Sequence, residues 1–147
     1  MSDRLAPLDV VWVFDREAID RRTGAQGKWK ALVVMASHQP TGSLVFFRIN
    51  SVAQTRRGPR PGSVPIAKEP HHRFLDHDSF LFCGGPPVVL TEPQLQAAMS
   101  GQSIPQRHGI VGRIHASLVP AIVAAVEKSA ELSETLRAFI LDSLRQP

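Results

Sequence analysis

The stretch "WKALVVMASHQPTGSLVFFRIN", residues 29–50, contains the pattern that decides the fold. Its first half is an unbroken apolar run, which predicts a strand buried on both faces. The turn chemistry follows in "HQPTG", because Pro40 presets one backbone angle and Gly42 allows a positive one. "SLVFFRIN" predicts a second strand. We therefore expect residues 30–50 to form a β-hairpin.

Further strands are expected on both sides of this hairpin. "DVVWVFD", residues 9–15, comes before it, while "SFLFC" and "HGIVGRI" follow, with a short strand near residues 64–67. Helices come later in the chain. Thr91 and Gln94 match a capping box before one helix, and we expect Ser117 and Ser133 to cap two amphipathic helices. Strands followed by helices predict an α+β domain built on a strongly bent antiparallel sheet.

Length and composition predict one domain. At 147 residues the chain can bury a core without disulfides, and its one cysteine, Cys83, cannot form an internal bridge. We expect a single domain over residues 1–147, with a C-terminal helical extension from about residue 117. The sequence shows neither the apolar core of a signal peptide nor a run of about 20 apolar residues, so we expect a cytoplasmic protein without membrane contact.

The positive charge is concentrated in the first half. Residues 16–73 contain eleven Lys or Arg against three acids, whereas residues 74–147 contain five against seven. This asymmetry favours an anionic partner, of which nucleic acid is the commonest. The alternative is that these are solvated loop charges that maintain solubility.

The stretch "HHRFLDHDSFLFCGG", residues 71–85, concentrates metal-ligand residue types. A transition-metal hypothesis would use His71, His72, Asp76, His77 and Asp78. Adjacent residues of an extended chain point to opposite faces, so few of the five could converge. No HExxH or CxxC motif completes a site. We therefore expect no metal site here, and expect Asp78 to bond backbone amides.

Nucleophilic chemistry is weakly indicated in the same stretch. Ser79 beside His77 and Asp78 supplies the residue types of a triad, but neighbours on a strand do not aim at one point. We expect Cys83 to be a buried strand residue. The basic residues offer phosphate chemistry instead. Cleavage through a ribose 2′-hydroxyl needs cationic groups and hydrogen-bond donors at the phosphate.

Two segments carry candidate residues for that chemistry. The first is the loop after residue 15 and the start of the next strand, with Arg21, Arg22, Lys28 and Lys30; the second is the end of the following strand, with Asn50 and Ser51. The alternative is that Lys28 and Lys30 are solvated lysines where a strand starts, and that residues 50–51 only begin a turn.

The order of these segments resembles the MazF/PemK-type toxins. The resemblance lies in "DVVWV", a long polar loop, "KALVVM", a third strand ending in "INS", then "FLDHDSFLFC" and "VGRIHASLVPAIVAAV". It covers roughly residues 9–51 and 74–127. It implies a small SH3-like β-barrel with helices, a homodimer, and an acidic antitoxin as partner.

The resemblance also implies metal-independent cleavage of single-stranded RNA, without a cofactor, by a toxin of a type II toxin–antitoxin system. By position, the catalytic residues would be Lys28, Asn50 and Ser51. RNA-binding residues would be Arg21, Arg22, Lys30, Arg56, Arg57 and Arg60. The family's Arg-Pro before the second strand is "KWK" here. The alternative is therefore a non-enzymatic SH3-like module that recognises an acidic protein segment or nucleic acid.

Overall fold

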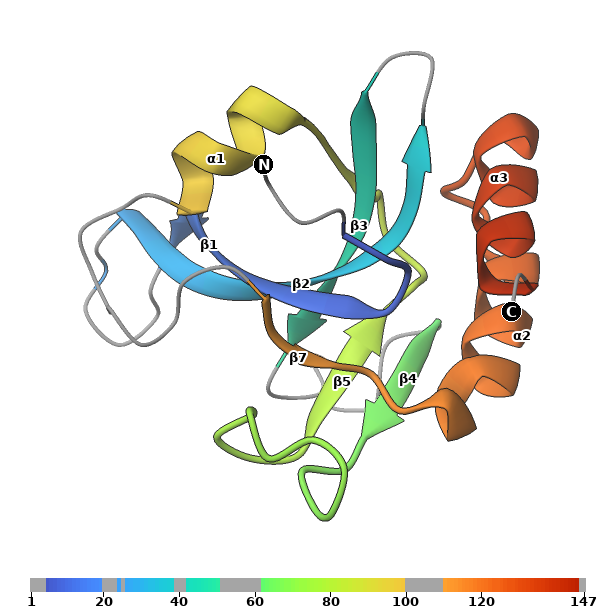
Figure 1. Ribbon diagram of the computed structural model, residues 1–147, viewed down its shortest axis with the longest axis horizontal. Helices are drawn as coiled ribbons and strands as arrows, with labels where there is room; N and C mark the ends of the chain where they lie inside the picture. The colour runs from blue at the N-terminus through green and yellow to red at the C-terminus, as the bar shows by residue number, and fades with distance from the viewer. Residues whose placement is uncertain are drawn as a thin grey trace.

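The computed structural model describes residues 5–19, 24, 26–38, 42–50, 62–99 and 110–145, without the side chains of 14–19, 26–29 and 38. These residues form a curled antiparallel sheet with helices on both faces (Figure 1). The α+β class and the bent antiparallel sheet that the sequence predicts are confirmed.

Within the described residues the sheet has seven strands. They are β1 (Asp9–Ile19), β2 (Gln26–His38), β3 (Ser43–Asn50), β4 (Ser63–Ile66), β5 (Ser79–Phe82), β6 (Val88–Thr91) and β7 (Ile110–Arg113). Six follow the order β4-β5-β3-β2-β1-β7. The first half of β3 pairs with β6 and its last three residues pair with β5. The expected hairpin is the pair β2 and β3, which is confirmed.

The helices are α1 (Glu92–Met99), the short 3₁₀ helix η2 (Ala116–Leu118), α2 (Val119–Lys128) and α3 (Glu134–Arg145). The capping box before α1 is confirmed. The Thr91 amide donates to Gln94 Oε1 over 2.9 Å, and the Gln94 amide donates to Thr91 Oγ1 over 3.3 Å. Ser133 Oγ accepts the Leu136 amide over 3.1 Å at the start of α3, as expected.

The prediction that Ser117 caps α2 is wrong. The Ser117 amide donates to Nδ1 of His115 over 3.1 Å, so His115 caps η2 instead. The helix α2 begins after Leu118, and no side chain caps it. The 3₁₀ turn moves the helix start past the serine, since Ser117 already lies inside that turn.

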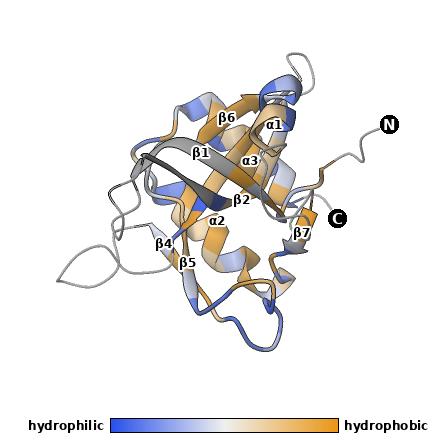
Figure 2. Ribbon diagram, turned by 90° about the vertical axis from the view of Figure 1, so that its left-hand side faces the viewer, coloured by the Kyte–Doolittle hydropathy of each residue, from blue (hydrophilic) through white to orange (hydrophobic). Residues whose placement is uncertain are grey.

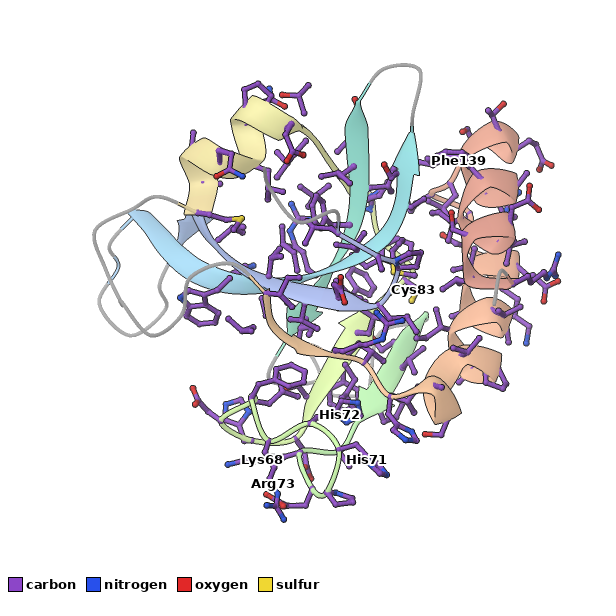
Figure 3. The ribbon with its side chains drawn as sticks, viewed as in Figure 1. Lys68, His71, His72, Arg73, Cys83 and Phe139 are labelled. Carbon is purple, nitrogen blue, oxygen red and sulfur yellow. The ribbon has the colours of Figure 1, made fainter. Side chains whose placement is uncertain are left out.

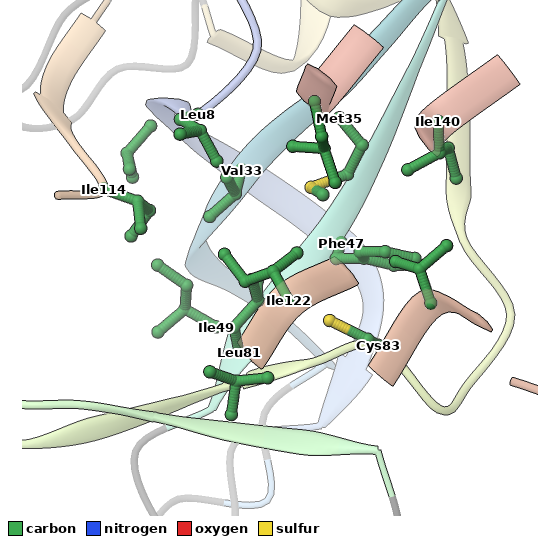
Figure 4. Close-up of a cluster of buried hydrophobic side chains, with 14 of the residues drawn as sticks. Leu8, Val33, Met35, Phe47, Ile49, Leu81, Cys83, Ile114, Ile122 and Ile140 are labelled. Carbon is green, nitrogen blue, oxygen red and sulfur yellow. The ribbon is translucent and has the colours of Figure 1, made fainter. Parts of the chain in front are cut away.

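Two apolar cores lie on opposite faces of the sheet. The first lies between the sheet and the column of α2 and α3 and includes Val33, Phe47, Leu81, Ile122 and Ile140 (Figures 1 and 4). The second lies under α1 and includes Val11, Val13, Leu32, Val34, Leu44, Phe46 and Leu95. Residues 31–36 of β2 are all buried, which confirms the predicted strand with two buried faces.

The loop between β4 and β5, residues 67–78, differs from these layers in its hydropathy. Figure 2 shows it mostly in hydrophilic colours below β4 and β5. Its residues Lys68, His71 and Arg73 lie at the end of the molecule away from α1 (Figures 1 and 3). In the described part of the chain, no helix has the length and apolar character needed to cross a membrane.

Candidate functional site

Charged and polar residues continue the sheet face that carries the second core. Side chains alternate between the two faces of a strand, so residues two apart share a face. On β2, Lys30 therefore shares the face of Leu32, a second-core residue. On β3, Arg48 and Asn50 share the face of Phe46 in the same way. This face thus changes from apolar to basic and polar along both strands.

Two aromatic side chains of β5 join the same face. Leu81 belongs to the first core, so Phe80 and Phe82 on either side of it belong to the opposite face. The register pairs Phe82 with Arg48 and Phe80 with Asn50. Directly paired residues of antiparallel strands have Cβ atoms about 4.5–5.5 Å apart. We call Lys30, Arg48, Asn50, Phe80 and Phe82 the basic–aromatic strip.

The residues of the strip are half-buried rather than fully solvated. Arg48 Nη1 donates to the carbonyl of Pro86, in the segment between β5 and β6, over a long distance of 3.4 Å. The ring of Phe82 lies on the backbone of Gly85, where a Cβ would come within 2.5 Å of the ring. The glycine therefore leaves room for the aromatic ring. Such a surface offers cationic groups beside aromatic rings.

Two of the candidate residues from the sequence, Lys30 and Asn50, belong to this strip. Leu32 and Arg48 pair across β2 and β3. Lys30 lies two residues before Leu32, and Asn50 lies two residues after Arg48. Continuing the antiparallel register therefore places Lys30 opposite Asn50. Their neighbour Lys28 lies on β2 opposite Asp15 of β1, and its side chain lies outside the described set. Arg21, Arg22, Ser51, Arg56, Arg57 and Arg60 also lie outside the described residues.

In the histidine-rich stretch, residues 71–85, the side chains of Asp78 and Ser79 bond to the backbone. Among the described residues, no group of three or more His, Cys, Asp or Glu side chains could hold a metal ion. Asp78 Oδ1 accepts the Lys68 amide over 2.8 Å, which confirms the expected backbone role of Asp78. Ser79 Oγ donates to the backbone carbonyl of His77 over 3.0 Å. The hydroxyl thus serves the local turn, and the imidazole ring is not its acceptor.

Cys83 is buried, as the sequence predicts. It follows β5 directly and lies in the first core (Figure 4). Burial raises the pKa of its thiol to about 12. The thiolate, which is the nucleophilic form, is therefore strongly disfavoured at neutral pH.

Sequence reasoning did not single out Arg48, Phe80 and Phe82. Alternation within "SFLFC" and "VFFRIN" shows which residues share a face within one strand. It does not show that β5 pairs with the end of β3, which is what places Phe82 opposite Arg48. Neither protein-family models nor curated protein sequences match this chain.

Proposed function

We propose that this chain binds single-stranded RNA across the basic–aromatic strip and cleaves it without a metal ion, as a MazF/PemK-like toxin. The curled antiparallel sheet with C-terminal helices supports the SH3-like barrel of that family. Non-enzymatic SH3-like binding modules would have the same architecture. The proposal therefore rests on the chemistry of the strip.

The observation that carries the proposal is the pairing of Arg48 with Phe82 beside Lys30 and Asn50. Cationic side chains neutralise phosphates, and aromatic rings stack on unpaired bases. A duplex hides its base faces inside the stack, whereas a single strand exposes them. Asn50 adds an amide that can both donate and accept hydrogen bonds at a base edge or a ribose.

The proposed cleavage is a transesterification within the RNA strand. The ribose 2′-oxygen attacks the phosphorus, its proton passes to a base, and the 5′-oxygen leaves with a proton from an acid. The products are a 2′,3′-cyclic phosphate and a 5′-hydroxyl. We propose Lys28, Asn50 and Ser51 as the catalytic residues, with Lys30 binding the same phosphate. Their cationic and amide groups would stabilise the charge that develops on its oxygens.

A homodimer and an acidic antitoxin segment are part of the same proposal. A chain with a net charge of +4, eleven of whose seventeen Lys and Arg lie in residues 16–73, suits an acidic partner. Such a segment would compete with RNA for the basic–aromatic strip.

The test uses a 5′-labelled unstructured RNA incubated with the protein in EDTA. We expect fragments with cyclic phosphate ends, and we expect a Lys28→Ala, Ser51→Ala double variant to bind RNA without producing them. A Lys30→Gln, Arg48→Gln variant should bind RNA more weakly than the wild type. Lys128 is exposed in the last turn of α2, away from the strip. Lys128→Gln removes one positive charge there and should behave as the wild type.

Each other outcome has a definite reading. RNA binding without cleavage by the wild type would support the non-enzymatic alternative. Binding of an acidic peptide but not of RNA would assign the strip to a protein partner. RNA binding that is as tight without Lys30 and Arg48 as in the wild type would contradict the proposed location.

A further inference from the structure

His72 connects the loop of residues 67–78 to the segment after β7. Its side chain is buried, with the residue 4% exposed. Nδ1 lies 2.8 Å from the carbonyl of Ala67, and Nε2 accepts the backbone amide of His115 over 3.0 Å. Figure 3 shows His72 directed inward from the loop, while the neighbouring Lys68 and Arg73 lie at its rim.

These two contacts fit one tautomer of the neutral ring. Nε2 must carry a lone pair to accept an amide hydrogen, so the hydrogen of the neutral ring lies on Nδ1 and points at the Ala67 carbonyl. A protonated imidazole has a hydrogen on both nitrogens. Its Nε2–H would then face the His115 N–H, and the bond between the two segments would be lost.

We propose that His72 is an acid-sensitive latch, which holds the loop of residues 67–78 against the start of η2 when neutral and releases it when protonated. The loop runs directly into β5, whose Phe80 belongs to the basic–aromatic strip. The latch itself does not rest on the proposed function. It is a property of the contacts between His72, Ala67 and His115.

The surroundings of His72 favour release once it is charged. Its ring nitrogens face backbone groups, and its ring contacts His71 and Phe74 edge-on. The rings of His71 and His115 stack beside it with centroids 3.7 Å apart. Protonation of His72 together with His71 and His115 would bring like charges together. The titratable and charged residues of the two segments are Lys68, Glu69, His71, Arg73, Asp76, His77, Asp78, Arg113 and His115.

Glu69 and Asp78 of the loop, and Asp9 of β1, have other partners. Glu69 pairs with Arg73 over 2.8 Å, and Asp78 Oδ1 accepts the Lys68 amide over 2.8 Å. Arg113 Nη1 pairs with Asp9 Oδ1 over 2.8 Å. Both ring nitrogens of His72 have backbone partners instead.

The test measures hydrogen exchange of the His115 amide between pH 7.5 and 5.0, divided by its intrinsic rate at each pH. We expect protection to fall about five- to tenfold toward pH 5.0, as for the loss of one hydrogen bond. Nitrogen-15 spectra at pH 7.5 should show the Nδ1–H tautomer of His72. His71→Ala and His115→Ala keep the His115 backbone donor and should keep the response.

The discriminating variant is His72→Gln, whose side-chain oxygen can accept the same amide without titrating in this range. Its protection should be independent of pH. An Nε2–H tautomer in the wild type, unchanged wild-type protection at pH 5.0, or an equal fall in His72→Gln would each overturn the latch. If His72→Gln does not fold, the wild-type tautomer and titration still decide the question.

Discussion

Asp9 and Arg113 join β1 to β7 across 104 residues of sequence, with Oδ1 and Nη1 2.8 Å apart. The second carboxylate oxygen of Asp9 accepts the Ala6 amide over 2.8 Å. The Asp9 side chain is 12% exposed and that of Arg113 is 57% exposed. Asp9 therefore holds the chain before β1, β1 itself and the edge strand β7 in one place.

Replacing Asp9 should destabilise the protein more than replacing its partner. Asp9→Ala leaves the partly buried Ala6 amide and the Arg113 guanidinium without their acceptor, and we expect a loss of about 1–3 kcal/mol in the free energy of unfolding. Arg113→Gln should cost less than about 1 kcal/mol, since its exposed guanidinium is screened by solvent. Urea unfolding of both variants measures the difference. Equal losses would show that the ion pair, and not the backbone contact, dominates.

Gly62 should tolerate no side chain. Its φ is +89°, and a Cβ would lie 2.5 Å from the Cα of Gly84, which is backbone and cannot move aside cheaply. We expect Gly62→Ala to cost more than about 2 kcal/mol. Gly42 has a φ of +67° with nothing within 4 Å of its Cβ position.

Gly42→Ala is therefore the matched control, because it introduces the backbone strain without the contact. It should cost about 1 kcal/mol. Thermal unfolding of the two variants separates the cost of the positive φ from the cost of the contact with Gly84. A Gly42→Ala variant as unstable as Gly62→Ala would assign the whole effect to φ.

Cys83 should be unreactive until the protein unfolds. Burial raises the pKa of its thiol from 9.0 to about 12, so the native state favours the neutral form. The contribution of the neutral Cys83 thiol to the free energy of unfolding is complete below pH 9 and is lost as the pH rises toward 12. We expect a thiol reagent to label the native protein at the rate of unfolding. Rapid native labelling at pH 8 would contradict the burial of Cys83.

The basic–aromatic strip predicts a salt dependence of RNA binding. Each phosphate contact to a single strand contributes about 0.7 to the slope of log affinity against log salt. Removing both Lys30 and Arg48 should lower that slope by about 1.4, whereas Phe80→Ala should weaken binding by about 1–3 kcal/mol with the slope unchanged. Fluorescence anisotropy across a salt series measures both. A slope that falls in Phe80→Ala would indicate that the ring positions a cation and does not stack.

Local patterns predicted the local structure well. The apolar run of β2, the positive φ of Gly42 and the serine before α3 depend on a few neighbouring residues, so the sequence carries their signals directly; Pro40 lies outside the described residues. Ser117 was misassigned because His115, two residues earlier, accepts its amide and starts a 3₁₀ turn first. The cap therefore depended on a competing side chain rather than on the serine itself.

The candidate site depended on contacts between distant segments. Lys30 and Asn50 were recognised by residue type, but Phe82 joined them only through strand pairing. The bond from the His115 amide to His72 spans 43 residues, and no spacing within "HHRFLDHD" indicates it. Residues 51–60 lie outside the described structure, so the roles expected of Ser51 and the arginines near it remain predictions.

The burial of β2 on both faces has a consequence for the position of the charges. A shift of β2 by one residue would move Lys30 from the strip into the first core and exchange Leu32 with Val33 between the two cores. Such a slip would bury an ammonium group and disturb both apolar layers together. Burial in the two cores thus selects the correct alignment of β2. Only in that alignment does Lys30 lie beside Arg48.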